Sequence, residues 1–321
     1  MRIELESYMS NMEDIAKYLG YTFYAPDDTQ MDSKARKAIG RIEAILFSRQ
    51  DLEDTNWSIA WKNIKKASKI YGENNVSFHF PVDDCDYIYD KFVRSRLIEA
   101  INRSADLGLR LVVLHANQRL LLDEWKNVDV SSMRINFINE LYNIVDKTDK
   151  GMVIGLENMP PIGNRNDDAD PLFIFPSDFK DIDHPRIKIT FDINHYFNVV
   201  ATMEEAKNNR SLKEKMPSFY GDCDYMDFQK IQDKIIHWHF SGFDNIANPL
   251  SNQICREGCC PWESKKVRED KFKEAARFII ENNKVDDERS VIFEVQDKDY
   301  SHRINVLKTA NWFMRQGEKD E

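Results

Sequence analysis

The sequence predicts a single-domain α/β protein, a (β/α)8 barrel, and three observations lead to this fold. Short apolar segments typical of buried parallel strands recur along the 321 residues, and most are followed by a segment with helical periodicity. An α/β barrel commonly uses about 250 residues or more as one unit, which accommodates a chain of this length. No glycine-rich phosphate loop follows any of these strands, which disfavours the competing architecture, an open nucleotide-binding sheet.

The expected strands add up to the eight that a barrel needs. Two lie near the N-terminus, at residues 2–8 and 21–25, and residues 30–71 are expected to be mainly helical because of stretches such as ARKAIGRIEAILF. The first 75 residues contribute least to the pattern. The six clearest strands are expected at residues 76–81, 111–117, 152–160, 187–195, 235–242 and 290–297. We therefore treat residues 1–321 as one barrel domain.

Helices and two long loops complete the predicted barrel. Apolar residues recur every three or four positions in residues 87–107, 131–146, 270–282 and 302–315, which predicts amphipathic helices. Two connections, residues 160–183 and 243–269, are unusually long. Both follow strands, so we expect both on the face of the barrel where active sites form, with residues 243–269 lying over the site.

Composition narrows the class of protein. The net charge is −10, which disfavours a broad nucleic-acid-binding face because phosphate contacts need clustered Lys and Arg. No apolar run approaches about 18 residues, and the acidic N-terminus lacks the apolar segment of a secretory signal. The five cysteines include Cys255, Cys259 and Cys260 in QICREGCCPW, which lacks CxxC spacing. We expect a cytoplasmic protein with reduced loop thiols, although a reversible disulfide in that loop stays open.

Metal-binding residue types gather at the predicted strand ends. Five of the seven histidines and three carboxylates lie within or just past the C-terminal halves of strands: His79, His115, His195, His237, His239, Glu157, Asp192 and Glu294. In a parallel barrel these ends converge on one mouth. Charged groups inside apolar runs are costly to bury unless they are paired or coordinated. A divalent cation bound by several of them explains the whole set.

Each residue taken alone has a simpler explanation. A single strand histidine such as His79 or His115 is more often a hydrogen-bonded core residue than a ligand. Asp192 with His195 in FDINH is also what a helix N-cap with a neighbouring ring looks like. His237 and His239 share one face of their strand, so only one of them need be a ligand. The metal site is preferred because it accounts for all these positions together.

These strand-end motifs resemble those of the xylose isomerase-like barrels, which include sugar isomerases, epimerases and endonuclease IV. The likeness covers about residues 76–297 and rests on short motifs. Sugar isomerases and epimerases of this group bind one Mn, Mg or Co ion through a Glu, Asp, His, Glu set. The resemblance assigns this set to Glu157 in LEN, Asp192 in FDINH, His239 in HWHFSG and Glu294 in FEVQD. His195 resembles a histidine that contacts substrate in those enzymes.

Endonuclease IV-like proteins resemble the chain at other positions. His79 in an HxP motif, His115, and the pair Asp192 and His195 match residues that ligate a cluster of three zinc ions in that family. That family also has an Asp-x-His motif after the His-rich strand, whereas residues 243–269 contain no histidine. A complete trinuclear phosphodiesterase is therefore not expected. Other barrels of the group use two or three iron ions to oxidise cysteine-containing peptides.

Our first hypothesis is a divalent-metal-dependent isomerase or epimerase of a sugar or sugar-like polyol. Glu157 and Glu294 would remove and return a proton beside metal-bound substrate oxygens. His195 and His237 would hold hydroxyls, and His79 and His115 would bind substrate or a second metal.

Two alternatives remain open at this level. One is an endonuclease IV-like phosphodiesterase with a reduced two-metal site, and the other is an iron-dependent peptide-modifying oxidase. The expected metal is Mn, Mg or Co for one site, and Zn or Fe for a multinuclear one. We expect the protein to bind a small carbohydrate and not to associate with a membrane. Binding of nucleic acid is possible but disfavoured, and the protein could form a homo-oligomer.

Overall fold

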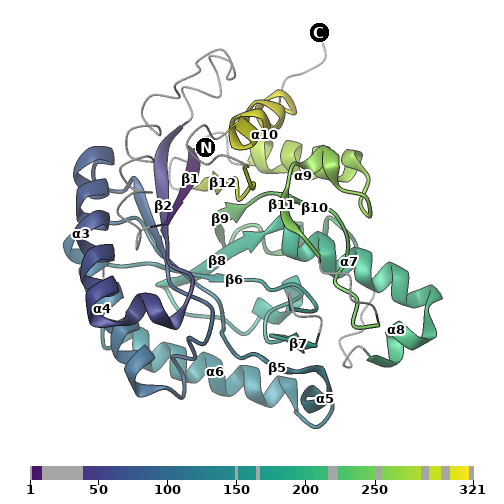
Figure 1. Cartoon of the computed structure of the whole chain (residues 1–321), viewed down its shortest axis with the longest axis horizontal. Coiled ribbons are helices and arrows are strands. Elements are labelled where there is room, and N and C mark those ends of the chain that lie inside the picture. The colour runs from purple at the N-terminus through teal and green to yellow at the C-terminus, as the bar shows by residue number, and fades with distance from the viewer. Residues whose placement is uncertain are drawn as a thin grey trace.

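Eight parallel strands close into a barrel in the computed structural model, with helices around it (Figure 1). The structure describes residues 2–8, 39–148, 151–163, 167–215, 223–250, 255–282, 289–297 and 304–317. The barrel strands are β1 (Arg2–Tyr8), β2 (Ile39–Ile45), β3 (Val76–His79), β4 (Val112–Leu114), β6 (Ile154–Glu157), β8 (Ile187–Asp192), β9 (Ile235–His239) and β12 (Ser290–Ile292). They pair in the order β1-β12-β9-β8-β6-β4-β3-β2, and β2 returns to β1.

Three of the barrel strands show most clearly the burial on both faces that parallel strands in a barrel require. Every residue of β3, β4 and β6 is buried. One face fills the barrel interior and the other packs against the helices. Phe78 of β3, for example, lies 5.3 Å from the ring of Trp61 on the helix outside it. This burial explains why these segments are continuous apolar runs in the sequence.

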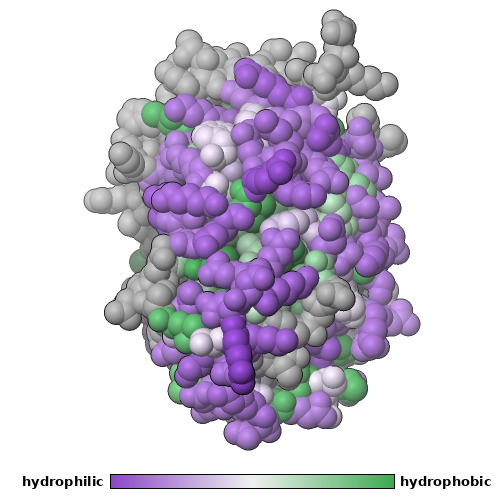
Figure 2. Space-filling view, turned by 90° about the vertical axis from the view of Figure 1, so that its right-hand side faces the viewer, coloured by the Kyte–Doolittle hydropathy of each residue, from purple (hydrophilic) through white to green (hydrophobic). Residues whose placement is uncertain are grey.

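The surrounding helices follow the strands in sequence. They are α3 (Asp54–Tyr71), α4 (Lys91–Asp106), α5 (Leu122–Trp125), α6 (Val130–Val145), α7 (Ile193–Asn208), α8 (Arg210–Lys215), α9 (Glu269–Asn282) and α10 (Ile304–Arg315). Aspartates cap the N-termini of two of these helices. Asp90 accepts hydrogen bonds from the amides of Phe92 and Val93 at the start of α4, and Asp129 caps α6 in the same way. Figure 2 shows that the side of the molecule on the right in Figure 1 is mainly hydrophilic.

The two long connections contain short elements of their own. The first includes β7 (Asp168–Ala169), which pairs antiparallel with β5 (Leu120–Leu121), and the 3-10 helix η3 (Pro176–Phe179). The second includes β11 (Glu257–Cys259), which pairs antiparallel with β10 (Gly242–Phe243), and η5 (Pro261–Glu263). Two further 3-10 helices are η2 (Arg49–Leu52) and η4 (Asp227–Ile231). The described parts of both connections therefore contain regular secondary structure.

The barrel and its described strands confirm most of the predicted strands, but one strand was predicted as helix. Ile39–Ile45 is β2, although we predicted residues 30–71 to be mainly helical. Within the described part of that range, the helices are η2 and α3. The isoleucines at 39, 42 and 45 have helical spacing, but pairing with β1 and β3 imposes the strand. The strand expected at 21–25 lies outside the described residues.

Helix α7 has no counterpart among the predicted helices. It begins directly at the end of β8, and all of its residues from Ile193 to Met203 are buried. An element buried on all sides lacks the alternation of apolar and polar faces on which the helix prediction relied. Within the described residues, none of the helices combines the length and apolar character needed to span a membrane.

Gly155 of β6 tests how tightly the barrel is packed. A Cβ atom at this position would lie 2.2 Å from Thr190 Oγ1 and 3.2 Å from a methyl carbon of Leu111. We expect Gly155→Ala to lower the free energy of unfolding by about 1–3 kcal/mol, because both neighbours are buried and must shift. Urea unfolding measures this, with Lys62→Ala on the exposed face of α3 as the control. Equal stability of the two variants would show that the barrel interior is loosely packed.

Candidate metal centre

The C-terminal ends of the barrel strands bring all eight predicted site residues into one cluster. The cluster extends from β3 around to the segment after β12 and is largely buried. Two carboxylates that the sequence analysis did not single out join it, Glu43 on β2 and Glu257 on β11. The residues come from barrel strands and the segments that follow them, so the closed barrel itself assembles the cluster.

Glu157 lies at the centre of the cluster. Its Oε2 is 3.3 Å from His79 Nε2 and 3.1 Å from His115 Nε2. Its Oε1 is 3.3 Å from His239 Nδ1 and 3.4 Å from His195 Nδ1. Burial by itself raises the pKa of this carboxyl, but His239 and His115 lower it well below its usual range. The side chain is thus an anion that connects two pairs of imidazoles.

Asp192 is both a helix cap and a member of the cluster. Its Oδ1 accepts from the His195 amide at 2.9 Å, which begins α7, and its Oδ2 lies 3.6 Å from His195 Nδ1. Asn158 holds the Asp192 backbone by donating to its carbonyl oxygen and accepting from its amide. Burial, together with the Glu294 and Glu157 carboxylates, raises the pKa of Asp192 to about 7 despite the attraction of His195. Asp192 therefore caps α7 and also lies in the cluster, while its role as a metal ligand stays a prediction.

His239 and His237 have different surroundings, although they point the same way along β9. His239 Nδ1 lies 3.1 Å from Glu294 Oε1, on the side of Glu157. His237 makes its contacts elsewhere: its Nε2 lies 2.7 Å from Glu43 Oε2, and its Nδ1 is 2.9 Å from Ser290 Oγ. These contacts favour His239 over His237 as a metal ligand.

The cluster fits a divalent cation. Four groups of side chains have ligand atoms within 4.8 Å of one another: Glu43, His237 and His239; His79, His115 and Glu157; Glu157, Asp192 and His195; and Asp192, His239 and Glu294. Several of these atoms are buried without a hydrogen-bond partner: Glu157 Oε2, Asp192 Oδ2 and both ring nitrogens of His239. Buried polar atoms without partners are costly unless a cation or a proton compensates them. Oxygen and imidazole nitrogen are ligands for Mn, Co, Zn and Fe alike.

The two additional carboxylates had unequal signals in the sequence. Glu43 is a charged residue inside an apolar run, which is the same signal that identified Glu157. The isoleucines of that run have helical spacing, however, so the sequence predicts a helix there and not a strand that leads to the site. Glu257 lies in the long connection after β9, where a charged residue is ordinary. Its Oε2 lies 3.9 Å from His195 Nε2. This contact brings one residue of the 243–269 connection beside the cluster, and the position of the whole connection over the site stays a prediction.

The cysteines of the same connection stay apart from the candidate metal groups. Cys255, Cys259 and Cys260 are buried free thiols, and none joins a candidate group in the part of the chain that the structure describes. Burial raises the pKa of Cys260 to about 11, so this thiol is protonated at neutral pH. Asn198 Nδ2 lies 3.3 Å from Cys255 Sγ. Their environment is that of structural rather than reactive thiols.

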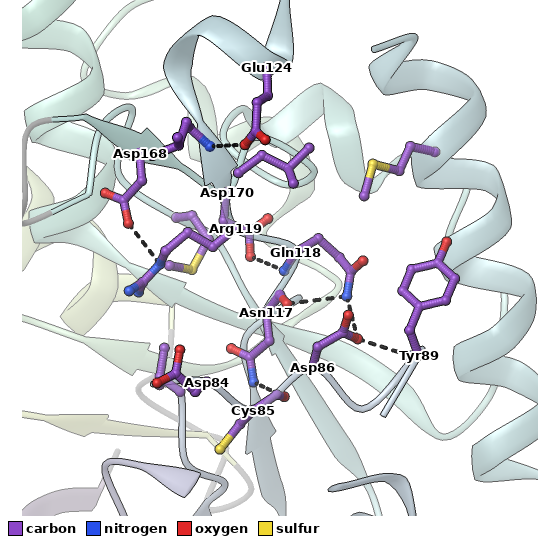
Figure 3. A pocket seen from close by; sticks show the side chains of 15 residues that line it. Asp84, Cys85, Asp86, Tyr89, Asn117, Gln118, Arg119, Glu124, Asp168 and Asp170 are labelled. Atoms are coloured by element: carbon purple, nitrogen blue, oxygen red, sulfur yellow. Dashed lines mark hydrogen bonds and ion pairs between the residues drawn. The ribbon is translucent and has the colours of Figure 1, made fainter. Parts of the chain in front are cut away.

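An acidic cavity of about 560 Å³ is built on the segments that follow three of the site residues (Figure 3). Its lining begins at Val82, Asn117 and Met159, two or three residues after His79, His115 and Glu157. Five carboxylates and one arginine line it: Asp84, Asp86, Glu124, Asp168, Asp170 and Arg119. Arg119 Nε pairs with Asp168 Oδ2 at 3.4 Å. The excess of carboxylates makes this cavity unfavourable for a phosphodiester.

Asp170 makes the stability of the protein depend on pH. Burial raises its pKa from 3.8 to about 6, although the Gln118 amide donates to its Oδ2 at 2.9 Å. The native state therefore holds this proton more tightly than the unfolded state. The resulting stabilisation is complete below about pH 4 and is lost as pH rises through about 6.

The substitution Asp170→Asn removes this ionisation. We expect the difference in unfolding free energy, variant minus wild type, to increase by about 2 kcal/mol as the pH rises from 4.5 to 7.5. The reason is that the variant avoids the buried charge that forms in the wild type. Urea unfolding at both pH values measures the difference, with exposed Asp181→Asn as the control. A constant difference across this range would contradict the buried ionisation of Asp170.

Comparisons with known proteins identify the family. The family model described as xylose isomerase-like TIM barrel matches residues 14–285. No curated protein matches the chain. Solved structures with this fold include a D-tagatose 3-epimerase-like protein, with 21% identity, a TM-score of 0.56, and 99% of this chain and 98% of that one covered.

Two structures from Thermus thermophilus share the fold as well. One, a protein soaked with zinc chloride, has 15% identity and a TM-score of 0.58, covering 99% of this chain and all (100%) of that one. The other, endonuclease IV, has 10% identity and a TM-score of 0.55, covering 98% and 100%. These identities show the fold alone, whereas the family model covers most of the chain. The protein belongs to the xylose isomerase-like TIM barrel family.

Proposed function

We propose that the protein is a divalent-metal-dependent isomerase or epimerase of a sugar or sugar-like polyol. The observation that carries this proposal is a pair of carboxylates flanking one point. Glu157 from β6 and Glu294 from the segment after β12 approach the same atom, His239 Nδ1, at 3.3 and 3.1 Å. In the strand order, β8 with Asp192 and β9 with His239 lie between them. The four side chains form an arc with a carboxylate at each end.

This arc suits proton transfer at carbon. A cation held by Glu157, Asp192, His239 and Glu294 would bind neighbouring substrate oxygens and increase the acidity of the adjacent C–H. Glu157 is placed to take the proton on one side and Glu294 to return one on the other. His195, whose side chain is 10% exposed, reaches the same region from the start of α7 and is placed to hold a hydroxyl. The burial of His237 favours a supporting role over substrate contact.

The acidic residues on the segments that follow three of the site strands support a neutral substrate. The cavity built on the segments after β3, β4 and β6 has five carboxylates and one arginine. A sugar or polyol carries no charge to repel, and its hydroxyls can donate to such carboxylates. The epimerase-like structural neighbour is consistent with this substrate class, although its likeness shows only a shared fold.

Metal content and two conservative variants test the proposal. In protein purified without added metal or a metal-binding tag, we expect about one Mn, Co or Mg per chain by plasma mass spectrometry. A panel of sugars and polyols then identifies a substrate by the change in stereochemistry or carbonyl position. Glu157→Gln and Glu294→Gln should each lower turnover by about 10²-fold or more, because each removes one proton-transfer group.

The matched control is Glu274→Gln on the exposed face of α9, which should leave turnover unchanged. Circular dichroism of all three variants confirms that the fold is retained. Retained turnover in either Glu157→Gln or Glu294→Gln would rule out the assigned acid/base pair.

A second candidate function, a two-metal hydrolase, is favoured by one specific observation. His79, His115 and Glu157 form a second ligand group, and they share Glu157 with the first. A carboxylate between two ligand sets is what a pair of bridged cations requires, and such pairs serve phosphoester hydrolysis. Against it stand the acidic cavity and the absence of histidine in residues 243–269.

The variant His115→Ala separates the two candidates. With two cations per chain, it should lower the metal content by about one, because it removes a ligand that only the second site uses. With one cation held by the arc, the metal content should not change. Two or more Zn or Fe per wild-type chain, lowered in this way, would overturn the one-metal proposal and direct attention to abasic DNA and peptide-oxidation assays.

A further inference from the structure

We propose that Glu43 is a positioning residue that fixes the protonation of His239, so that Nδ1 of His239 is the metal-binding atom. The inference rests on the proposed metal site and extends it to a carboxylate beneath the ligands. Glu43 lies on β2, and its side chain is fully buried (0% exposed) between His237 and His239 of β9. Nothing in its position gives it access to a substrate, so any role must act through these two histidines.

Arg110 determines which nitrogen of His237 carries the proton. Its Nη2 lies 2.8 Å from His237 Nδ1. A guanidinium only donates hydrogen bonds, so this Nδ1 must be the acceptor. The neutral ring then carries its proton on Nε2, which donates to Glu43 Oε2 at 2.7 Å. The hydroxyl of Ser290, 2.9 Å from the same Nδ1, can donate as well.

The second oxygen of Glu43 faces His239. Glu43 Oε1 lies 3.4 Å from His239 Nε2, and neither of these two buried atoms has a hydrogen-bond partner. A buried carboxylate oxygen needs a donor, and the imidazole supplies one when its Nε2 is protonated. The opposite nitrogen, Nδ1, then has its lone pair available. It is this nitrogen that lies beside Glu157 and Glu294.

The contacts therefore run from Arg110 to His237, from His237 to Glu43 and from Glu43 to His239, which faces the candidate metal ligands. Outer carboxylates that accept from the far nitrogen of a ligating imidazole set its tautomer and increase its basicity. The alternative, a separate cation between Glu43, His237 and His239, is less suitable. Both nitrogens of His237 already have hydrogen-bonding partners, and the Arg110 guanidinium beside that ring repels a cation.

The isosteric variant Glu43→Gln tests the inference. Its amide oxygen can still accept from His237, but its NH2 group then faces His239 Nε2 and requires this nitrogen to be an acceptor. His239 would carry its proton on Nδ1, in the direction of the metal ligands. Titration of the chelator-stripped full-length protein with Co2+, followed by visible absorption, should show about 10–100-fold weaker binding than wild type.

Two further variants distinguish positioning from space filling. Glu43→Asp keeps the negative charge but leaves a gap, so it should retain more affinity for Co2+ than Glu43→Gln if the acceptor matters; the reverse order would indicate simple packing. Ser290→Ala removes one donor to His237 while Arg110 remains, and it should bind Co2+ like wild type. Glu43→Gln that folds and binds Co2+ as tightly as wild type would overturn the inference.

A direct measurement covers the case in which Glu43→Gln does not fold. Long-range proton–nitrogen NMR spectra of the wild-type protein loaded with Zn2+ report which nitrogen of His239 carries the proton. We expect Nε2–H with the metal on Nδ1, and Nδ1–H would overturn the role of Glu43. Failure of the wild-type chain to bind either Co2+ or Zn2+ would instead refute the metal site itself, and the role of Glu43 with it.

Discussion

The burial of the Glu157 carboxylate is the constraint on which the rest of the site depends. A single anion at 1% exposure is costly by several kcal/mol unless opposite charges or donors surround it. Four imidazole nitrogens lie 3.1–3.4 Å from its two oxygens, and they come from β3, β9, the start of α7 and the residue after β4. Only a closed parallel barrel brings these chain segments to one point. Closure of the barrel therefore assembles the candidate metal centre.

The site has two levels along the barrel axis. Nearer the mouth, Asp192, His239 and Glu294 form one candidate ligand group, and Glu157, Asp192 and His195 form another. Beneath them, Glu43 connects His239 to His237, which is itself held by Arg110 and Ser290. The lower level, in which Glu43 and His237 are fully buried, has no access to a substrate. Its physical effect is to orient the imidazole above it, which a metal ligand needs as much as it needs the correct distance.

The segments that follow the strands carry further acidic residues. The connection after β9 places Glu257 near His195, and the segments after β3, β4 and β6 form an acidic cavity. Both features add negative charge around a site that is already rich in carboxylates. The carboxylates of the cavity would oppose the binding of a polyanion there. A neutral polyol meets no such opposition.

The sequence by itself determined the barrel and eight members of the cluster, because buried strands are apolar runs and any His, Asp or Glu inside them stands out. It could not find Glu43, since IGRIEAI has helical spacing and only pairing with β1 and β3 makes it a strand. It could not separate His237 from His239, because strand alternation gives both the same direction. Tertiary structure decided these points, and the position of Glu257, because each depends on contacts between segments far apart in the chain, such as Glu43 with His237.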